Sequence, residues 1–202
     1  MGEYGWTLTD VSPETLARLA EKLNNANSTY IAADGTHLPF TGQSFDGLYM
    51  VATLHHLPDV KQGINEFRRV LQPGGQLVIA IEPNITYFRW IKYFRKWLCR
   101  VIHMDPHEGS HADAEMEGFC HRELKNLFAH NNWNNLEIKP VWFLVGWWHY
   151  GAELLFRSLR LKKRLVLPSP LEWILVYLDE LLFKIPGVKY VAWHWYISAT
   201  KI

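Results

Sequence analysis

The chain of 202 residues is long enough for one domain of ordinary size and short for two. Hydrophobic residues make up 49% of it and charged residues 20%, which excludes a disordered or low-complexity protein. The formal net charge is only +1, so the composition argues against a polycation that coats nucleic acid, and we expect no nucleic-acid partner.

The first residues hold no basic segment followed by an apolar run, so we expect no secretory signal. The longest apolar stretch, from Val141 to Trp148, is far shorter than the roughly 18 residues of a spanning helix. Cys99 and Cys120 make no disulfide framework, which fits a reducing compartment. We therefore expect a soluble, cytoplasmic protein with a single domain over residues 1–202.

Strands and helices are predicted to alternate from the start of the chain. Residues 4–9 are rich in aromatic and β-branched side chains and predict a strand. Ser12 is a good N-cap and Pro13 suits the first helical position, so a helix should follow as far as Leu23. Residues 30–33 predict a second strand, which ends at Asp34 and Gly35.

The alternation continues with a strand at residues 45–53 and a helix at residues 64–71. Pro73, Gly74 and Gly75 end that helix, because a tight helix-to-strand turn needs glycine's backbone freedom. Residues 76–82 are nearly all apolar, as expected of a parallel strand covered on both faces. This order predicts an α/β fold with a mostly parallel sheet.

In the second half, residues 85–103 predict a helix that mixes aromatic side chains with the basic residues Arg89, Lys92, Arg95, Lys96 and Arg100. Such a helix either lies on an anionic membrane surface or covers the sheet with a solvated basic face, and both interpretations stay open. A second basic cluster at residues 157–164 adds to the membrane-peripheral interpretation. Residues 171–182 predict an amphipathic helix that covers the core with its leucines and keeps Glu172 and Asp179 on the other side.

Polar residues follow the predicted strands at the edge where ligands of open parallel sheets bind. They are Asp10, Asp34 with Gly35, residues 53–56, and Glu82. One carboxylate there can take both hydroxyls of a ribose, and a second can accept from an exocyclic amine, so together they predict a nucleoside site. Singly, Asp10 is equally explained as a helix-favouring carboxylate and Asp34-Gly35 as a turn.

Three segments occur in a specific order: TDVSPETLARLAEKL (9–23), ADGTHLPFTGQSFDGLYMVATLHHLPD (33–59) and EFRRVLQPGGQLVIAIEPN (66–84). With them the sequence resembles the class I S-adenosylmethionine-dependent methyltransferases of type 11, the ubiquinone/menaquinone-methyltransferase-like group. The resemblance covers residues 4–84 closely and the rest loosely.

The resemblance implies a Rossmann-like sheet with a C-terminal antiparallel strand, a cofactor-side half (1–84) and a substrate-side half (85–202). Asp10 corresponds to the carboxylate that holds the cofactor's ribose, and Asp34 to the one at the adenine amino group, with Gly35 beneath the ring. Residues 52–56, with Thr53, correspond to the place that cradles the methionine end and admits the substrate. Residues 119–138 then match a helix and strand, and 190–199 the terminal strand.

One part of the family pattern is absent. The Glu/Asp-x-Gly-x-Gly loop, with its strand and helix, should precede residues 4–9, where Met1 already stands, and Gly2 and Gly5 do not rebuild it. Without that strand, the pair at 4–9 and 30–33 must find another neighbour. Three explanations stay open: a fragment of a longer enzyme, a split enzyme whose second chain supplies the loop, or a relative without catalysis.

We therefore expect an S-adenosylmethionine-dependent methyltransferase that acts on a small-molecule or lipid-like acceptor by in-line displacement. Where the acceptor must lose a proton, His55 or His56 is the candidate base. The histidines at 103, 107, 111 and 121 follow no ligand motif, so we expect no metal. The alternative is a non-catalytic methyltransferase-like fragment or partner subunit that has lost cofactor binding. A nicotinamide dehydrogenase is less favoured, because no GxGxxG is present.

Overall fold

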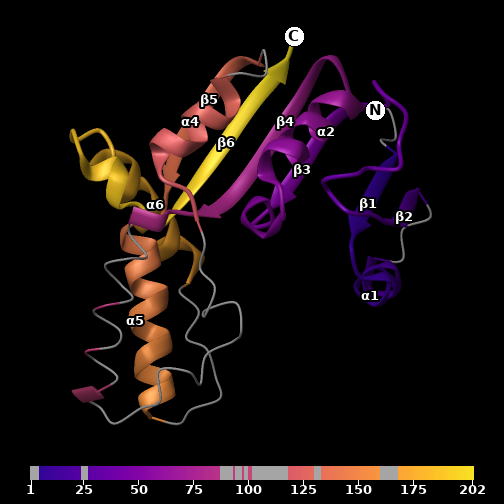
Figure 1. Cartoon of the computed structure of the whole chain (residues 1–202). Helices are drawn as coiled ribbons and strands as arrows, with labels where there is room; N and C mark the ends of the chain where they lie inside the picture. Colours follow the sequence, from indigo (N-terminus) through magenta and orange to yellow (C-terminus); the bar gives the residue numbers. More distant parts are fainter. Residues whose placement is uncertain are drawn as a thin grey trace.

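The computed structural model describes residues 5–23, 27–86, 93, 97, 100–101, 118–129, 133–159 and 168–202. The strands are β1 (Trp6–Asp10), β2 (Ser28–Ala32), β3 (Phe45–Val51), β4 (Leu71–Pro83), β5 (Trp133–Val141) and β6 (His194–Lys201). The helices are α1 (Pro13–Leu23), α2 (Val60–Val70), α4 (His121–Ala129), α5 (Leu144–Ser158) and α6 (Ser169–Leu182), with short 3-10 turns η1 (Leu54–His56) and η3 (Val188–Val191). The predicted α/β alternation is confirmed (Figure 1).

Local sequence signals explain where several elements begin. The Ser12 hydroxyl accepts the backbone N–H of Thr15 at 3.1 Å, so Ser12 caps α1 as predicted. Helix α2 begins earlier than its apolar pattern suggested, because the Asp59 carboxylate accepts the N–H of Gln62 and starts the helix at Val60. The Pro-Gly-Gly turn lies inside the long strand β4, where Gly74 has a φ of 80°.

The larger sheet has the strand order β3-β4-β6-β5. Strands β3 and β4 pair in parallel, joined by the crossover helix α2, and β6 pairs antiparallel with both β4 and β5. Strands β3, β4 and β5 therefore run in one direction and β6 against them, which confirms the expected mostly parallel sheet with a C-terminal antiparallel strand.

Strands β1 and β2 form a separate parallel pair, with helix α1 as their connection. Among the described residues, β1 pairs on one side only, with β2, and β3 on one side only, with β4. The strand pair that was expected to need another neighbour thus has no third strand in the described part of the chain. The sheet is divided between β1 and β3, where each strand leaves an edge open (Figure 1).

The main core lies between the larger sheet and the helices α2 and α4 (Figure 1). Helix α2 contributes Ile64 and Phe67, one turn apart, and α4 contributes Leu124 and Phe128. Trp195 of β6 is only 1% exposed and lies among them. Burying a side chain of this size stabilises the fold by roughly 1.5–3 kcal/mol.

The prediction for residues 171–182 is wrong in its orientation. Leu171, Ile174 and Leu178 of α6 are 50%, 53% and 39% exposed, whereas Asp179 is only 3% exposed. The reason is that α5 lacks a cap of its own, and Asp179 supplies it by accepting the N–H groups of Phe143 and Leu144 at 2.8 and 2.7 Å. The need to satisfy the start of α5 turns the carboxylate inward and the leucines outward.

Most of the predicted helix 85–103, including Arg89, Lys92, Arg95 and Lys96, lies outside the described residues. The described positions within that range, Ile85, Thr86, Tyr93, Trp97, Arg100 and Val101, are helical. No helix in the part of the chain that the structure describes has the length and apolar character needed to cross a membrane.

Candidate active site at the strand ends

Glu82 lies at the carboxyl end of β4 and is fully buried. Leu77 and Ile79 are buried in strict alternation, and the next buried residue is Glu82 instead of Ile81. Ile81 has a φ of 61°, and the register of β4 against β6 shifts between Ile79 and Glu82. This β-bulge re-aims the carboxylate of Glu82 towards the end of β3, as bulges near functional sites commonly do.

Three backbone N–H groups and one ring nitrogen surround the Glu82 carboxylate. Its Oε1 accepts the backbone N–H of Thr53 at 2.9 Å and that of Leu54 at 2.8 Å. Its Oε2 lies 3.2 Å from the backbone nitrogen of His55 and 2.8 Å from the ring Nδ1 of the same residue. The carboxylate therefore fixes both the turn η1 and the histidine that the sequence singled out.

The two candidate histidines have different surroundings. The side chain of His55 is 10% exposed and bonds to Glu82, whereas His56 is exposed. Their rings lie 3.9 Å apart between centroids. The Thr53 hydroxyl donates to the carbonyl of Val51 at 2.7 Å, and its backbone N–H is taken by Glu82. Of the predicted residues on this sheet, Thr53 contacts the Glu82 carboxylate through its backbone and His55 also contacts it through its side chain.

His194 of β6 belongs to the same neighbourhood, because it pairs with Pro83, the residue that follows Glu82. Burial lowers the pKa of His194 to about 4, with the Glu82 carboxylate raising the pKa and His55 lowering it further. The next residue along β4, Asn84, is also fully buried, and its amide donates to the carbonyls of Tyr190 and Ala192. These contacts hold β6 beside the end of β4.

Asp10 and Asp34 lie at the carboxyl ends of β1 and β2 in the smaller sheet. The Asp10 Oδ1 accepts the N–H of Ser12 at 2.8 Å, and the Asp34 Oδ1 accepts the N–H of Thr36 at 2.8 Å. The backbone N–H of Thr36, with its hydroxyl, keeps the pKa of the Asp34 carboxyl below its ordinary value. Both carboxylates thus make the local contacts expected of residues that stabilise a helix start or a turn. Each carboxylate also has a second oxygen, Oδ2.

The loop after β2 joins the two parts of the predicted site. A Cβ on Gly35 would come within 2.9 Å of the Leu57 side chain, which follows η1. The Glu66 carboxylate of α2 accepts the N–H of Leu38 at 3.0 Å, and it is held in turn by Arg69. Gly35 therefore lies against the segment that follows His55 and His56, so the ends of β2 and β3 are neighbours.

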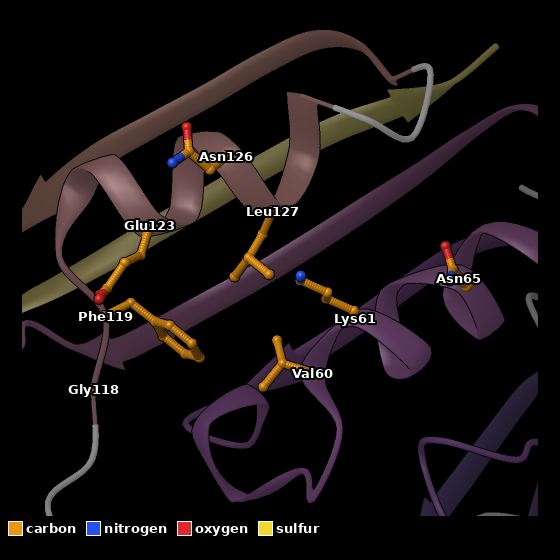
Figure 2. Close-up of a pocket in the computed structure, with 8 residues that line it drawn as sticks. All are labelled: Val60, Lys61, Asn65, Gly118, Phe119, Glu123, Asn126 and Leu127. Atoms are coloured by element: carbon orange, nitrogen blue, oxygen red, sulfur yellow. The ribbon is translucent and has the colours of Figure 1, made fainter.

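A pocket of about 820 Å³ lies between α2 and α4 (Figure 2). The side chains of Val60, Lys61, Phe119 and Leu127 point into it (Figure 2). None of the predicted site residues lines it. We therefore place the candidate chemistry at the strand ends, where buried charge and histidine meet, and not in this pocket.

The structure adds residues to the predicted set and leaves others aside. Glu82 was expected at the ligand-binding edge of the sheet, but its contact with His55 was not predicted; the available signal was a carboxylate at the end of an apolar strand. His103, His107 and His111 lie outside the described residues. Burial, together with Lys189 and Lys125, lowers the pKa of His121. No cluster of three metal-ligating side chains occurs among the residues that the structure describes.

Comparison with known proteins bears on this geometry. The type 11 family model, described as a methyltransferase domain, matches residues 2–79. A demethylmenaquinone methyltransferase of Desulfitobacterium hafniense is 35% identical over 149 residues, which cover 64% of this chain and 56% of that protein. The predicted resemblance to type 11 methyltransferases is therefore confirmed. The chain spans little more than half the length of this relative.

Solved structures confirm the fold class. A S-adenosylmethionine-dependent methyltransferase of Thermotoga maritima, described as a possible histamine N-methyltransferase, gives a TM-score of 0.57 at 16% identity, covering 97% of this chain and 72% of that one. A phosphoethanolamine N-methyltransferase of Haemonchus contortus, in complex with S-adenosylhomocysteine, gives 0.58 at 15% identity, covering 96% and 43%. The chain thus has a Rossmann-like methyltransferase fold.

Proposed function

We propose that this chain is the catalytic part of an S-adenosylmethionine-dependent methyltransferase whose acceptor is a small, quinone-type molecule. The observation that carries the proposal is the set of strand-end residues Asp10, Asp34, Gly35 and His55, held in neighbouring positions within a type 11 methyltransferase domain. The name of the Desulfitobacterium relative supports a quinone-type acceptor.

The residues present fit a nucleoside cofactor. Each of the two carboxylates uses its Oδ1 in a backbone turn, and a carboxylate has further lone pairs, which we assign to a ribose hydroxyl at Asp10 and to an adenine amine at Asp34. The lowered pKa of Asp34 keeps this acceptor charged at neutral pH. A Cβ at Gly35 would crowd the Leu57 methyl groups, so glycine lets the backbone after β2 lie close to the segment that follows η1. Bound S-adenosylmethionine supplies a methyl group that is already electrophilic, which leaves the protein to align the acceptor in line and to exclude water.

The open edges of β1 and β3 bear on how the site is completed. Both strands pair on one side only in the described part of the chain, and they flank the place where the family's glycine loop and its strand belong. We include in the proposal that a parallel strand closes this division, supplied by a further segment of the polypeptide or by a second chain. The membrane-surface prediction rests on basic side chains outside the described residues and stays a prediction.

Calorimetric titration of the folded chain with S-adenosylmethionine and S-adenosylhomocysteine tests the proposal. We expect micromolar binding, and we expect Asp10→Asn and Asp34→Asn each to weaken it by about 10- to 100-fold, as for a lost hydrogen bond to a charged group. Asp46→Asn is the matched control, because Asp46 is an exposed carboxylate at the start of β3, the opposite end from the site.

The rival function, a partner subunit without cofactor, predicts a different outcome. A folded chain that binds neither compound, and that still binds neither after a glycine-loop segment is fused ahead of residue 1, would favour the non-catalytic alternative. Equal affinity of the Asp10→Asn, Asp34→Asn and Asp46→Asn proteins would refute the assigned site while leaving the fold unaffected.

A further inference from the structure

The buried carboxylate of Glu82 and the ring of His55 form a pair that the proposed cofactor site does not explain. Glu82 accepts N–H groups from three successive backbone positions and from one side chain. Capping of the turn η1 accounts for the backbone contacts. It does not account for the 2.8 Å contact with the His55 Nδ1, which lies 27 residues away in sequence.

The geometry defines the tautomer of His55. The backbone N–H groups of Thr53, Leu54 and His55 donate to the Glu82 oxygens, and a carboxylate oxygen can only accept, so the proton shared with the ring sits on the His55 Nδ1. In a neutral imidazole only one ring nitrogen carries a proton. The His55 Nε2 is therefore the bare nitrogen, and its lone pair can accept a proton.

The surroundings leave this pair as the reactive one at the end of the sheet. Within the part of the chain that the structure describes, the charged and titratable groups that face His55 are Glu82 from β4, His194 from β6 and His56 from the same turn. His194 stays neutral at physiological pH because burial lowers its pKa to about 4. His56 is exposed and stacks against the His55 ring, whereas only 10% of the His55 side chain reaches solvent.

We propose that Glu82 is a positioning residue that holds His55 as the general base, and that the methyl acceptor is consequently one that must lose a proton. This inference rests on the proposed function and names its acceptor class: an acidic hydroxyl, or a ring carbon activated by one. The O–H or C–H bond of the acceptor breaks, and its proton forms an N–H bond at the His55 Nε2. The electron pair left on the acceptor forms the bond to the methyl group, whose bond to the sulfonium sulfur of S-adenosylmethionine breaks and leaves its electron pair on that sulfur. A thioether acceptor, or an amine already in its free-base form, needs no such base.

The first test does not require methyl transfer. In the chain labelled with ¹⁵N-histidine, the ring resonances of His55, assigned by their loss in His55→Gln, report which nitrogen carries the proton in the neutral state. We expect a protonated Nδ1 and a bare Nε2. Glu82→Gln should weaken or abolish this preference, and Asp59→Asn should leave it intact. Asp59 is the matched control because it caps α2 three residues after His56 and bonds only to a backbone N–H in the described contacts.

Kinetics with the hydroquinone form of demethylmenaquinone provide the second readout. His55→Gln and Glu82→Gln should each lower kcat by about a hundredfold or more, the range expected for loss of general base catalysis, while the affinity for S-adenosylmethionine changes by less than about threefold. His56→Gln should lower kcat much less than His55→Gln. Glu82→Asp keeps the charge and should recover part of both the tautomer signal and kcat.

An Nε2–H tautomer of His55 in the unmodified chain would overturn the inference even if the cofactor binds. An unchanged tautomer and kcat in Glu82→Gln would do the same. If Glu82→Gln does not fold, the tautomer of the unmodified chain and of Glu82→Asp decides. Absence of cofactor binding both in the unmodified chain and after a glycine-loop segment is fused ahead of residue 1, with the expected tautomer present, would instead refute the proposed function and leave the Glu82–His55 pair in place.

Discussion

Helix α5 contains two glycines at which substitution by alanine should have opposite effects on the stability of the fold. A Cβ built on Gly146 comes within 2.5 Å of both Cγ and Nε1 of Trp193, whereas one built on Gly151 meets nothing within 4 Å. Replacing glycine by alanine inside a helix gains about 1 kcal/mol at both positions, because the unfolded chain loses flexibility. The difference between the two variants therefore isolates the packing of α5 against Trp193.

The collision at Gly146 cannot be relieved locally. To reach 3.4 Å, the near limit of ordinary contact, the nearest atom of the Trp193 ring, Cδ1, would have to retreat by about 1 Å. That ring is flanked by Trp147 and Tyr150, and the Trp193 backbone is bonded at its N–H to Trp142 and at its carbonyl to Asn84. Overpacking of this kind costs about 1–3 kcal/mol. We expect Gly146→Ala to be less stable than Gly151→Ala by about 2 kcal/mol.

Urea unfolding followed by tryptophan fluorescence and far-ultraviolet circular dichroism measures this difference. Coincident transitions with an unchanged m value would license the comparison of midpoints. Gly151→Ala should raise the midpoint above that of the unmodified chain, and Gly146→Ala should lower it or leave it level. If both variants raise the midpoint equally, α5 does not pack against Trp193 as described.

Two further predictions concern buried polar groups. Asp179→Asn should destabilise the fold by about 2–3 kcal/mol, because the start of α5 loses its charged acceptor. As a control, substitution of the neighbouring exposed residue in Glu180→Gln should change the unfolding midpoint little. Equal effects of the two substitutions would contradict the assigned cap. His194 takes a proton near pH 6.5 when unfolded and only near pH 4 when folded, so the unfolded state binds more protons between these values and stability falls as pH falls through this window. The loss amounts to about 3 kcal/mol by pH 4, and His194→Gln should remove that part of the pH dependence of the urea midpoint; a parallel pH profile in the variant would contradict it.

Periodicity and local chemistry predicted the elements well where the relevant contacts are short in sequence. Ser12 and Thr15 are three residues apart, and the cap that they form was readable from the chain. The apolar run of residues 76–82 likewise located the second part of β4, but the expected burial on both faces is wrong, because Leu77 and Ile79 are buried on one face while Val78 and Ala80 are only half-buried on the other. The division of the sheet next to β1 and β3 also agrees with the missing glycine loop.

Long-range polar contacts were not predictable in the same way. The inward orientation of Asp179 follows from an uncapped helix that begins 35 residues earlier, at Leu144, and nothing in the α6 sequence records that need. An amphipathic pattern says which residues share a helix face, but not whether that face meets the core. The pattern of leucines was therefore identified correctly and its direction was not.

The burial of Glu82 in the candidate site was likewise not predictable from the sequence pattern. Strict alternation along β4 from Leu77 and Ile79 would place Glu82 on the face opposite those residues and bury Ile81 in its stead. The bulge at Ile81 shifts the phase by one residue and buries the carboxylate beside His55. A left-handed backbone at a β-branched residue is unfavourable by about 1–3 kcal/mol and persists only where the surrounding contacts enforce it. Here four N–H groups donate to Glu82, and these hydrogen bonds can offset that strain. The irregular backbone at Ile81 therefore marks the position where the fold departs from the regular strand pattern to place a buried carboxylate beside a histidine.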